Sequence, residues 1–366
     1  MKTSESFLQA LKQAGIDFYA GVPDSVLQAF TQALAAEPNH IIAANEGAAL
    51  TAAAAYHLAT GKIGLVYLQN SGVGNLINPL TSLADASVYG CPTLLLIGWR
   101  GRPGGKDEPQ HFRMGSITLP LLELLSVPVL RLEKESDATA AVMQAIEKSS
   151  STNHPVALLV EEGYFEKAVE QEQHIYPLSA QMVIQSLINR ASRDDVFLCT
   201  TGKTGRLFYS INQKSGNKII KYFLNVGAMG HLSSLAAVFS RFQASRIFVL
   251  DGDGSLLMHL GAFVANGFLM QDNLHYLVLN NGCHQSVGGQ ATVGFQTRFA
   301  DMASLAGFTD TIEISTASGF ESWLGNISLR KEFADIRINT EMPDNLPRPE
   351  NSPGEEKNQL QKALGL

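Results

Sequence analysis

Residues 246–254 read RIFVLDGDG, and residues 274–282 read LHYLVLNNG. Each stretch is an apolar run that ends in acidic or amide side chains and glycine. The 25 residues between Gly254 and Asn280 are enough for one helix and the return strand of a βαβ unit. The two strands are then parallel. The pattern therefore predicts that Asp253 and Asn281 lie at neighbouring carboxyl ends of a sheet, where ligands bind in open α/β folds.

The polar residues after these runs are suited to a metal ion and a phosphate. Asp253 and Asn281 each offer a hard oxygen, and a loop carbonyl just after Asn281 offers a third. Such oxygens suit Mg²⁺ or Ca²⁺, and Mg²⁺ usually keeps water and phosphate oxygens as its other ligands. Gly252 and Gly254 let backbone N–H groups approach a phosphate closely. An Asp-Gly pair alone is more often an ordinary turn, but its context here favours a metal–diphosphate site.

Composition excludes several classes of function. The chain has 366 residues, with 34 acidic against 27 basic side chains, and its basic residues form no long run. This balance disfavours a nucleic-acid partner, and no apolar stretch is long enough for a membrane span. The three cysteines have no metal-binding spacing and fit a reducing compartment. We therefore expect a cytoplasmic protein without a membrane or nucleic-acid partner.

Apolar runs and helical stretches alternate along both halves of the chain. This alternation is typical of parallel, doubly wound sheets. We expect an α/β protein with two such domains, residues 1–168 and 179–366, joined by a polar linker at 169–178. Thr3 or Ser4 should cap the first helix, Ser179 should cap the first helix of the second domain, and a last helix should follow the polar tail. The expected strands are Phe18–Val22, Ile41–Ala44, Ile63–Leu68, Thr93–Ile97, Val127–Leu132, Val156–Val160, Val196–Cys199, Ile219–Phe223, Ile247–Leu250, His275–Leu279, Thr311–Ile314 and Ala334–Ile338.

A set of short motifs extends over nearly the whole chain. It comprises Gly21–Ser25 (GVPDS), Asn45–Gly47 (NEG), Gln69–Asn75 (QNSGVGN), Lys106–His111 (KDEPQH), Thr200–Gly202 (TTG), Thr204–Arg206 (TGR), Gly227–His231 (GAMGH), Gly252–Gly254 (GDG), Asn280–Asn281 (NN) and Gly288–Val293 (GGQATV). Singly most of these are common, but together they are specific. With them the chain resembles the thiamine-diphosphate-dependent 2-oxoacid decarboxylases. The family often has Asp-Asn where this chain has Asn280 and Asn281.

The resemblance implies an architecture and a cofactor. The first domain would bind the pyrimidine of thiamine diphosphate and the second its diphosphate with Mg²⁺, and the short linker leaves no room for the middle domain of larger relatives. In such enzymes the site lies between domains of different subunits, so a homodimer or a higher homo-oligomer is implied.

The resemblance also implies a reaction on a small anionic 2-oxoacid. It is strongest to members that act on 3-phosphonopyruvate, which gives phosphonoacetaldehyde and CO₂ in phosphonate biosynthesis; members that act on sulfopyruvate are the near alternative. A carboligase of the same cofactor class is a third possibility, although such enzymes usually carry the middle domain. A binding protein without turnover should have lost Glu46 or the metal pair. A nicotinamide dehydrogenase is disfavoured because Gly72 and Gly74 lack the third glycine of the dinucleotide motif.

Glu46 is the first of three candidate catalytic residues. An acid at the start of an alanine-rich helix can be an ordinary cap. The small residues around it also leave room for a flat ring and would raise its pKa. By resemblance, Glu46 hydrogen-bonds the cofactor's pyrimidine and favours its reactive tautomer. Asp24 and His111 are the candidate proton-handling pair on the substrate side, with their division of roles left open.

The remaining site residues are also assigned by resemblance. The Gly227 carbonyl and Met229 would contact the pyrimidine. Asp253 and Asn281 would bind the metal by side chain, and Cys283 by its carbonyl. Residues expected around the cofactor's phosphates are Thr201, Gly202, Gly252, Gly254 and Ser255.

The segment Gly98–Met114 (GWRGRPGGKDEPQHFRM) is long, polar and rich in glycine. Such composition predicts a loop, which is often functional but can be merely solvated. A phosphonate beside a carboxylate requires a local cationic pocket, and arginine suits tetrahedral oxyanions. We therefore predict that Arg100, Lys106, Arg113 and Ser25 bind the anionic substrate.

Overall fold

The computed structural model describes residues 3–168, 175–216, 220–327, 330–343 and 345–366, and these divide into two compact units. Unit 1 comprises 1–170 with 286–290, and unit 2 comprises 171–285 with 291–366. Most of the predicted linker, residues 169–174, lies outside the described residues. Among the described residues, no helix has the length and apolar character needed to cross a membrane.

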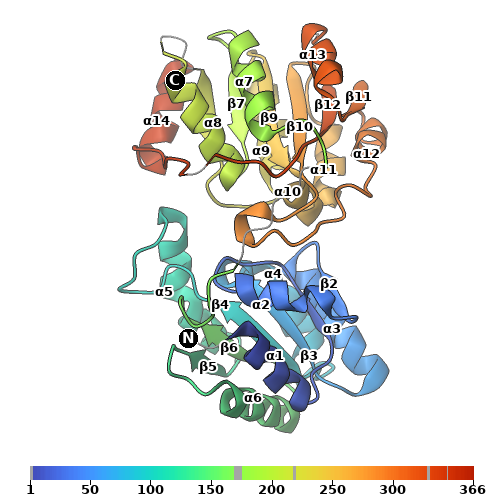
Figure 1. The fold of residues 1–366 in the computed structure, drawn as a ribbon, viewed down its shortest axis with the longest axis vertical. Coiled ribbons are helices and arrows are strands. Elements are labelled where there is room, and N and C mark those ends of the chain that lie inside the picture. The colour runs from blue at the N-terminus through green and yellow to red at the C-terminus, as the bar shows by residue number, and fades with distance from the viewer. Residues whose placement is uncertain (1–2, 169–174, 217–219, 328–329, 344) are drawn as a thin grey trace. The chain divides into compact units, whose positions relative to one another are not determined.

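Unit 1 is built on a six-stranded parallel sheet in the order β2-β1-β3-β4-β6-β5. Helices α1, α2 and α6 cover one face and α3, α4 and α5 the other, as Figure 1 shows. Its elements are α1 (Ser4–Gln13), β1 (Tyr19–Gly21), α2 (Gln28–Ala33), β2 (His40–Ile42), α3 (Glu46–Thr60), β3 (Gly64–Gln69), α4 (Val73–Pro79), β4 (Thr93–Gly98), α5 (Pro109–Leu124), β5 (Val129–Leu132), α6 (Ala138–Thr152) and β6 (Val156–Val160).

Unit 2 repeats this plan with a parallel sheet in the order β11-β12-β10-β9-β7-β8. Helices α7, α8 and α13 pack on one face, and α9, α11, α12 and α14 on the other. Its elements are α7 (Ala180–Arg190), β7 (Val196–Cys199), α8 (Lys203–Lys214), β8 (Lys221–Leu224), α9 (Leu232–Phe242), β9 (Ile247–Gly252), α10 (Asp253–Met258), α11 (Leu260–Gly267), β10 (Leu274–Asn280), α12 (Phe299–Leu305), β11 (Asp310–Ile314), α13 (Ala317–Gly325), β12 (Glu332–Arg337) and α14 (Pro353–Ala363).

The central strands β3, β4 and β6 of unit 1 and β7, β9 and β10 of unit 2 are buried on both faces, which explains their largely apolar runs. In β3, Leu65 and Tyr67 join the core on one side of the sheet, and Val66 and Leu68 join the core on the other. This two-residue alternation follows from the pleat of a strand. The predicted α/β class with two doubly wound parallel sheets is confirmed.

The segment 98–114 differs from its prediction as a loop. Only its first part is irregular, because α5 begins at Pro109. Proline fits the first position of a helix, since its fixed φ suits the helix and its missing N–H would have had no partner there. His111 and Arg113 therefore lie on the first turns of a helix.

Candidate functional site

Each sheet has a switch point where the strand order reverses, and some of the candidate residues follow the strands beside it. In unit 1 the switch lies between β1 and β3, and Asp24 follows β1. In unit 2 it lies between β7 and β9, which are followed by Thr201 and Asp253. Switch points are where open α/β sheets bind ligands.

Asp253 is a buried carboxylate in a narrow space. Its side chain accepts a hydrogen bond from Thr292 Oγ1, and the residue is 2% exposed. Burial raises the pKa of Asp253 to about 6, and the hydrogen bond from Thr292 opposes this rise. A β-carbon at Gly294 would overlap the Asp253 carboxylate. Asp253 is therefore a buried acid whose surroundings are kept clear of side chains on the side of Gly294.

Asn281 is the second residue predicted to bind the metal by its side chain. Its Oδ1 accepts the Cys283 amide at 3.1 Å, and its Nδ2 donates to Gln285 Oε1 at 2.9 Å. Gly282 takes a positive φ of 67°, and a β-carbon there would meet the ring of Phe295. Burial raises the pKa of the Cys283 thiol to about 12, so the thiol stays neutral. Metal binding by the Asn281 side chain and the Cys283 carbonyl stays a prediction.

A buried network that the sequence did not reveal supports this turn. Asn280 Nδ2 donates to the Gly294 carbonyl at 2.9 Å and to Asp335 Oδ1 at 3.0 Å. Arg337 Nη1 donates to the same Gly294 carbonyl at 3.1 Å. An aspartate at position 280 would place a second carboxylate against Asp335, which gives a physical reason for asparagine here. The only signal in the sequence was the departure from the family's Asp-Asn pair.

The predicted phosphate and pyrimidine residues lie on neighbouring turns of unit 2. Gly202, with φ 89°, precedes α8, and Thr201 Oγ1 donates to the Val226 carbonyl at 2.9 Å. Ser255 Oγ accepts the Gly230 amide at 3.3 Å. These two bonds fix the turn 226–230, which contains Gly227 and Met229, against the loop after β7 and against α10.

Glu46 begins α3 in unit 1 and is 5% exposed. Asn45 caps the helix, since its Oδ1 accepts the Ala48 amide at 3.0 Å. The Glu46 side chain is therefore not the cap, and its Oε2 accepts a hydrogen bond from Asn75 Nδ2 at 2.6 Å. Burial raises the pKa of Glu46, and the bond from Asn75 opposes this rise only in part.

Gly72 allows Glu46 to occupy its position. A β-carbon at Gly72 would overlap the Glu46 carboxyl group, whereas one at Gly74 would meet nothing within 4 Å. We predict that Gly72→Ala displaces Glu46 and destabilises the fold by roughly 1–3 kcal/mol, as overpacking does. Gly74→Ala, inside α4, should be neutral or stabilising by up to about 1 kcal/mol because alanine favours helices. Denaturant unfolding of both variants tests this; equal losses of stability would contradict it.

Asp24 lies in the loop after β1 and is completely buried. Its Oδ2 accepts the Val26 amide at 2.9 Å, and its Oδ1 has no hydrogen-bond partner among the described residues. Burial raises the pKa of Asp24 to about 6, while the Val26 amide and the charge of Arg100 oppose this rise. A β-carbon at Gly98 would overlap the Asp24 carboxylate. Asp24 is therefore an acid that readily holds a proton.

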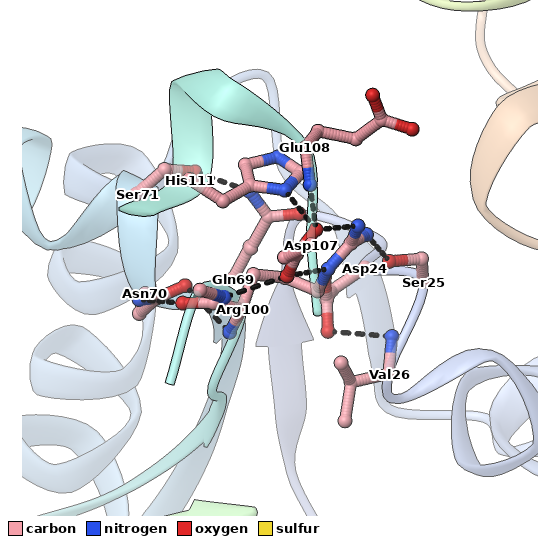
Figure 2. Close-up of polar contacts among 11 residues, drawn as sticks. Asp24, Ser25, Val26, Gln69, Asn70, Ser71, Arg100, Asp107, Glu108 and His111 are labelled. Atoms are coloured by element: carbon pink, nitrogen blue, oxygen red, sulfur yellow. Dashed lines mark hydrogen bonds and ion pairs between the residues drawn. The ribbon is translucent and has the colours of Figure 1, made fainter. Parts of the chain in front are cut away.

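Figure 2 shows that Ser25, Arg100, Asp107 and His111 form a connected set. Arg100 Nη1 donates to Ser25 Oγ at 2.5 Å, and Arg100 holds Asp107 with two hydrogen bonds, one of them from Nε at 2.8 Å. His111 Nδ1 lies 2.7 Å from Asp107 Oδ1. Asp107 was not among the predicted site residues. Its only signal was its place in the KDEPQH motif.

Two predicted substrate ligands lie apart from this set. Lys106 and Arg113 are exposed, Lys106 in the loop before α5 and Arg113 on α5 itself. The structure thus brings Ser25 and Arg100 together with His111 and places Lys106 and Arg113 at the surface.

Two family models match the chain, one over each unit. Residues 1–117 match the model of the thiamine pyrophosphate enzyme, N-terminal TPP binding domain, and residues 200–337 match that of the C-terminal TPP binding domain. The two matches define a thiamine pyrophosphate enzyme.

Among thiamine pyrophosphate enzymes, the chain is similar to several decarboxylases. The chain is 31% identical to a phosphonopyruvate decarboxylase of Streptomyces viridochromogenes over 80% of this chain and 77% of that protein. It is 29% identical to one of Streptomyces hygroscopicus, over 84% and 80%. It is 32% identical to the sulfopyruvate decarboxylase subunit alpha of Methanothermobacter thermautotrophicus, over 44% and 98%. The chain belongs to the thiamine-diphosphate-dependent 2-oxoacid decarboxylases, which are carbon–carbon lyases.

Proposed function

We propose that this protein decarboxylates 3-phosphonopyruvate to phosphonoacetaldehyde and CO₂, using thiamine diphosphate and Mg²⁺, as a step in phosphonate biosynthesis. The observation that carries the choice of substrate is the 31% identity, over 80% of the chain, to a relative named for this reaction. The observation that supports decarboxylase chemistry is the buried Glu46 carboxyl group, beside which Gly72 leaves room.

Unit 2 fits a metal ion bound together with a diphosphate. Asp253 and Asn281 would bind Mg²⁺ by their side chains and Cys283 by its carbonyl, which leaves other positions for phosphate and water oxygens. The described residues contain no group of three or more His, Cys, Asp or Glu side chains that could hold a metal ion. That finding agrees with a site that uses one carboxylate and relies on the diphosphate. Thr201, Gly202, Gly252, Gly254 and Ser255 would contact the phosphates.

Thiamine diphosphate, when bound, supplies the electron sink for the bond to CO₂. Glu46 would hold a proton at its carboxyl group and share it with the pyrimidine ring, and its burial favours the protonated form. The Gly227 carbonyl would accept a hydrogen bond from the pyrimidine amine, and Met229 would support the bent cofactor. The sulfopyruvate decarboxylase of Methanothermobacter thermautotrophicus has an alpha and a beta subunit, which supports our proposal that a homodimer or a higher homo-oligomer is the active form.

On the substrate side, Asp24 and His111 would move the proton that replaces CO₂ on the product. Asp24 is suited to hold that proton because it is buried with one oxygen unpartnered among the described residues. Ser25, Arg100, Lys106 and Arg113 would bind the carboxylate and phosphonate. The exposure of Lys106 and Arg113 suits cations that meet a charged substrate as it arrives.

CO₂ release from a panel of substrates tests the proposal. With thiamine diphosphate and Mg²⁺ present, we expect kcat/KM for phosphonopyruvate to exceed that for sulfopyruvate and pyruvate by at least about tenfold, since each tenfold requires only about 1.4 kcal/mol of differential binding. Omission of the cofactor should abolish release. A preference for pyruvate would refute the assigned substrate.

Sulfopyruvate is the second candidate substrate. It is favoured by the 32% identity to a sulfopyruvate decarboxylase subunit alpha, which matches over 98% of its own length. A sulfonate is tetrahedral, as a phosphonate is, but carries one charge. The same panel decides between them, because a pocket with several cations should favour the more highly charged phosphonate as pH rises.

A further inference from the structure

The geometry of unit 1 points to a role for Asp107, a residue outside the predicted site. Asp107 lies between Arg100, which follows β4, and His111, in the first turn of α5. It accepts hydrogen bonds from Arg100, from the Gly101 amide at 2.6 Å and from the Glu108 amide at 2.7 Å, and its Oδ1 lies 2.7 Å from His111 Nδ1. Arg100 and the two amides can only donate, so a proton on Asp107 would displace one of these bonds.

This arrangement keeps Asp107 ionised although it is largely buried. Burial by itself would raise its pKa, but the bonds from Arg100, His111 and two backbone amides outweigh that effect and hold the pKa of Asp107 below its ordinary value. Asp24 is in the opposite situation, with one amide donor and an oxygen unpartnered among the described residues. The pKa values of two carboxyl groups of unit 1 are therefore shifted in opposite directions, the pattern that separates acid from base roles in enzymes.

An ionised Asp107 determines which nitrogen of His111 carries the proton. A carboxylate can only accept, so the nitrogen that faces it, Nδ1, must be the donor. In the neutral ring the lone pair then lies on Nε2. Gly101 and Gly115 hold this geometry, because a β-carbon at Gly101 would overlap the His111 carbonyl, and one at Gly115 would overlap that of Gly101.

We propose that Asp107, held by Arg100, is a positioning residue that fixes His111 in the Nδ1–H tautomer and presents Nε2 as the proton acceptor towards the substrate. This inference rests on the proposed function in one respect, which is that His111 lies beside the substrate. It also separates the roles of Asp24 and His111: Asp24 donates a proton, and His111 accepts one at Nε2. Arg100 then holds Asp107 in addition to the substrate contact proposed for it.

The first test measures the tautomer and requires no turnover. The ¹⁵N chemical shifts of uniformly labelled protein distinguish Nδ1–H from Nε2–H imidazoles, and comparison with His111→Gln identifies the His111 signals. We expect Nδ1–H in the wild type at pH 8 and a mixture of tautomers in Asp107→Asn. Glu123→Gln, the same type of change at an exposed position of α5, should leave the signals unchanged. An Nε2–H ring in the wild type, or unchanged signals in Asp107→Asn, would overturn the proposal.

The second test is a double-mutant cycle on kcat, measured with whichever 2-oxoacid the enzyme turns over best. Asp107→Asn should lower kcat at least about tenfold and change KM by less than about threefold, because it alters proton transfer and not binding. In a His111→Gln background the same change should lower kcat by less than about twofold, since Asp107 acts through His111. Additive losses would mean that Asp107 acts independently of His111, and would refute the role. If phosphonopyruvate proves not to be the substrate, both tests still apply.

Discussion

Glu46→Gln is expected to lower kcat by about 10²–10⁴-fold, the usual contribution of a positioned acid or base, and to leave cofactor affinity within a few fold of the wild type. Glutamine has the same size and can still accept the hydrogen bond from Asn75 Nδ2 that Glu46 receives at 2.6 Å. It cannot exchange a proton with the pyrimidine. Steady-state CO₂ release and calorimetric titration with thiamine diphosphate measure the two quantities separately.

The same substitution should change stability with a pH dependence of known sign. Burial raises the pKa of Glu46 above its ordinary value. A carboxyl group with a raised pKa in the folded state contributes stability below its unfolded-state pKa, and this contribution is lost as pH rises through the folded-state pKa. Without cofactor, Glu46→Gln should therefore unfold at a higher temperature than the wild type at pH 8, and the difference should shrink towards pH 4.

Glu5→Gln is the matched control, because Glu5 is an exposed glutamate that also lies in the first turn of a helix. It should change neither kcat nor the pH dependence of unfolding by a measurable amount. If Glu46→Gln kept near-normal turnover, Glu46 would have no proton role, and its burial would have to be explained by packing alone.

The fold could be predicted from the sequence because its signals are local. Each of the twelve predicted strands corresponds to a strand of the structure, with ends that shift by a few residues, as from Val127 to Val129 at the start of β5. The predicted caps at Thr3 and Ser179 are also confirmed, since both side chains accept amide hydrogen bonds. A strand buried on both faces is usually apolar, so its own residues identify it. The exception is β12, whose buried residues include Glu332, Asp335 and Arg337.

The supports of the candidate site could not be predicted because they are not local. Thr292 reaches Asp253 across 39 residues, and Asp335 reaches Asn280 across 55. These contacts depend on the order of strands in the sheet and on how one loop folds back, which no periodicity encodes. Asp107 was not predicted for another reason. The sequence favoured its cationic neighbour Lys106 as a substrate ligand, and it did not predict the helix that begins at Pro109.

The structure also distinguishes the two aspartates of the opening motif. Asp251 is satisfied within its own unit, since it accepts hydrogen bonds from Tyr276 Oη at 2.6 Å and from the Gly252 amide at 2.9 Å. Asp253 accepts a hydrogen bond from Thr292 and from nearby backbone amides, and it lies beside the space that Gly294 leaves. A carboxylate held by a buried tyrosine is a structural group, and one that lies beside open space is the better metal ligand.

Asp253→Asn should therefore abolish binding of thiamine diphosphate and Mg²⁺ at working concentrations. Loss of partners that only orient metal ligands costs about 10–100-fold in affinity, so loss of the charged ligand itself should cost at least about 100-fold. With ligand at 100 times the wild-type Kd, the wild type gains about 2.7 kcal/mol of stability, and a variant with 100-fold weaker binding gains only about 0.4 kcal/mol. Thermal unfolding with and without the cofactor measures this difference directly.

Asp272→Asn is the control, because Asp272 is an exposed aspartate of the same unit and should leave the ligand-induced shift unchanged. The apo form of Asp253→Asn should fold normally, since asparagine keeps the shape of the side chain and an oxygen that can accept from Thr292. A full ligand-induced shift in Asp253→Asn would show that the diphosphate and metal are held elsewhere. The variant could also lose the rise in unfolding temperature with Mg²⁺ and thiamine diphosphate together but keep the rise with thiamine diphosphate alone. In that case Asp253 binds the metal, and Thr201, Gly202 and Ser255 bind the phosphates.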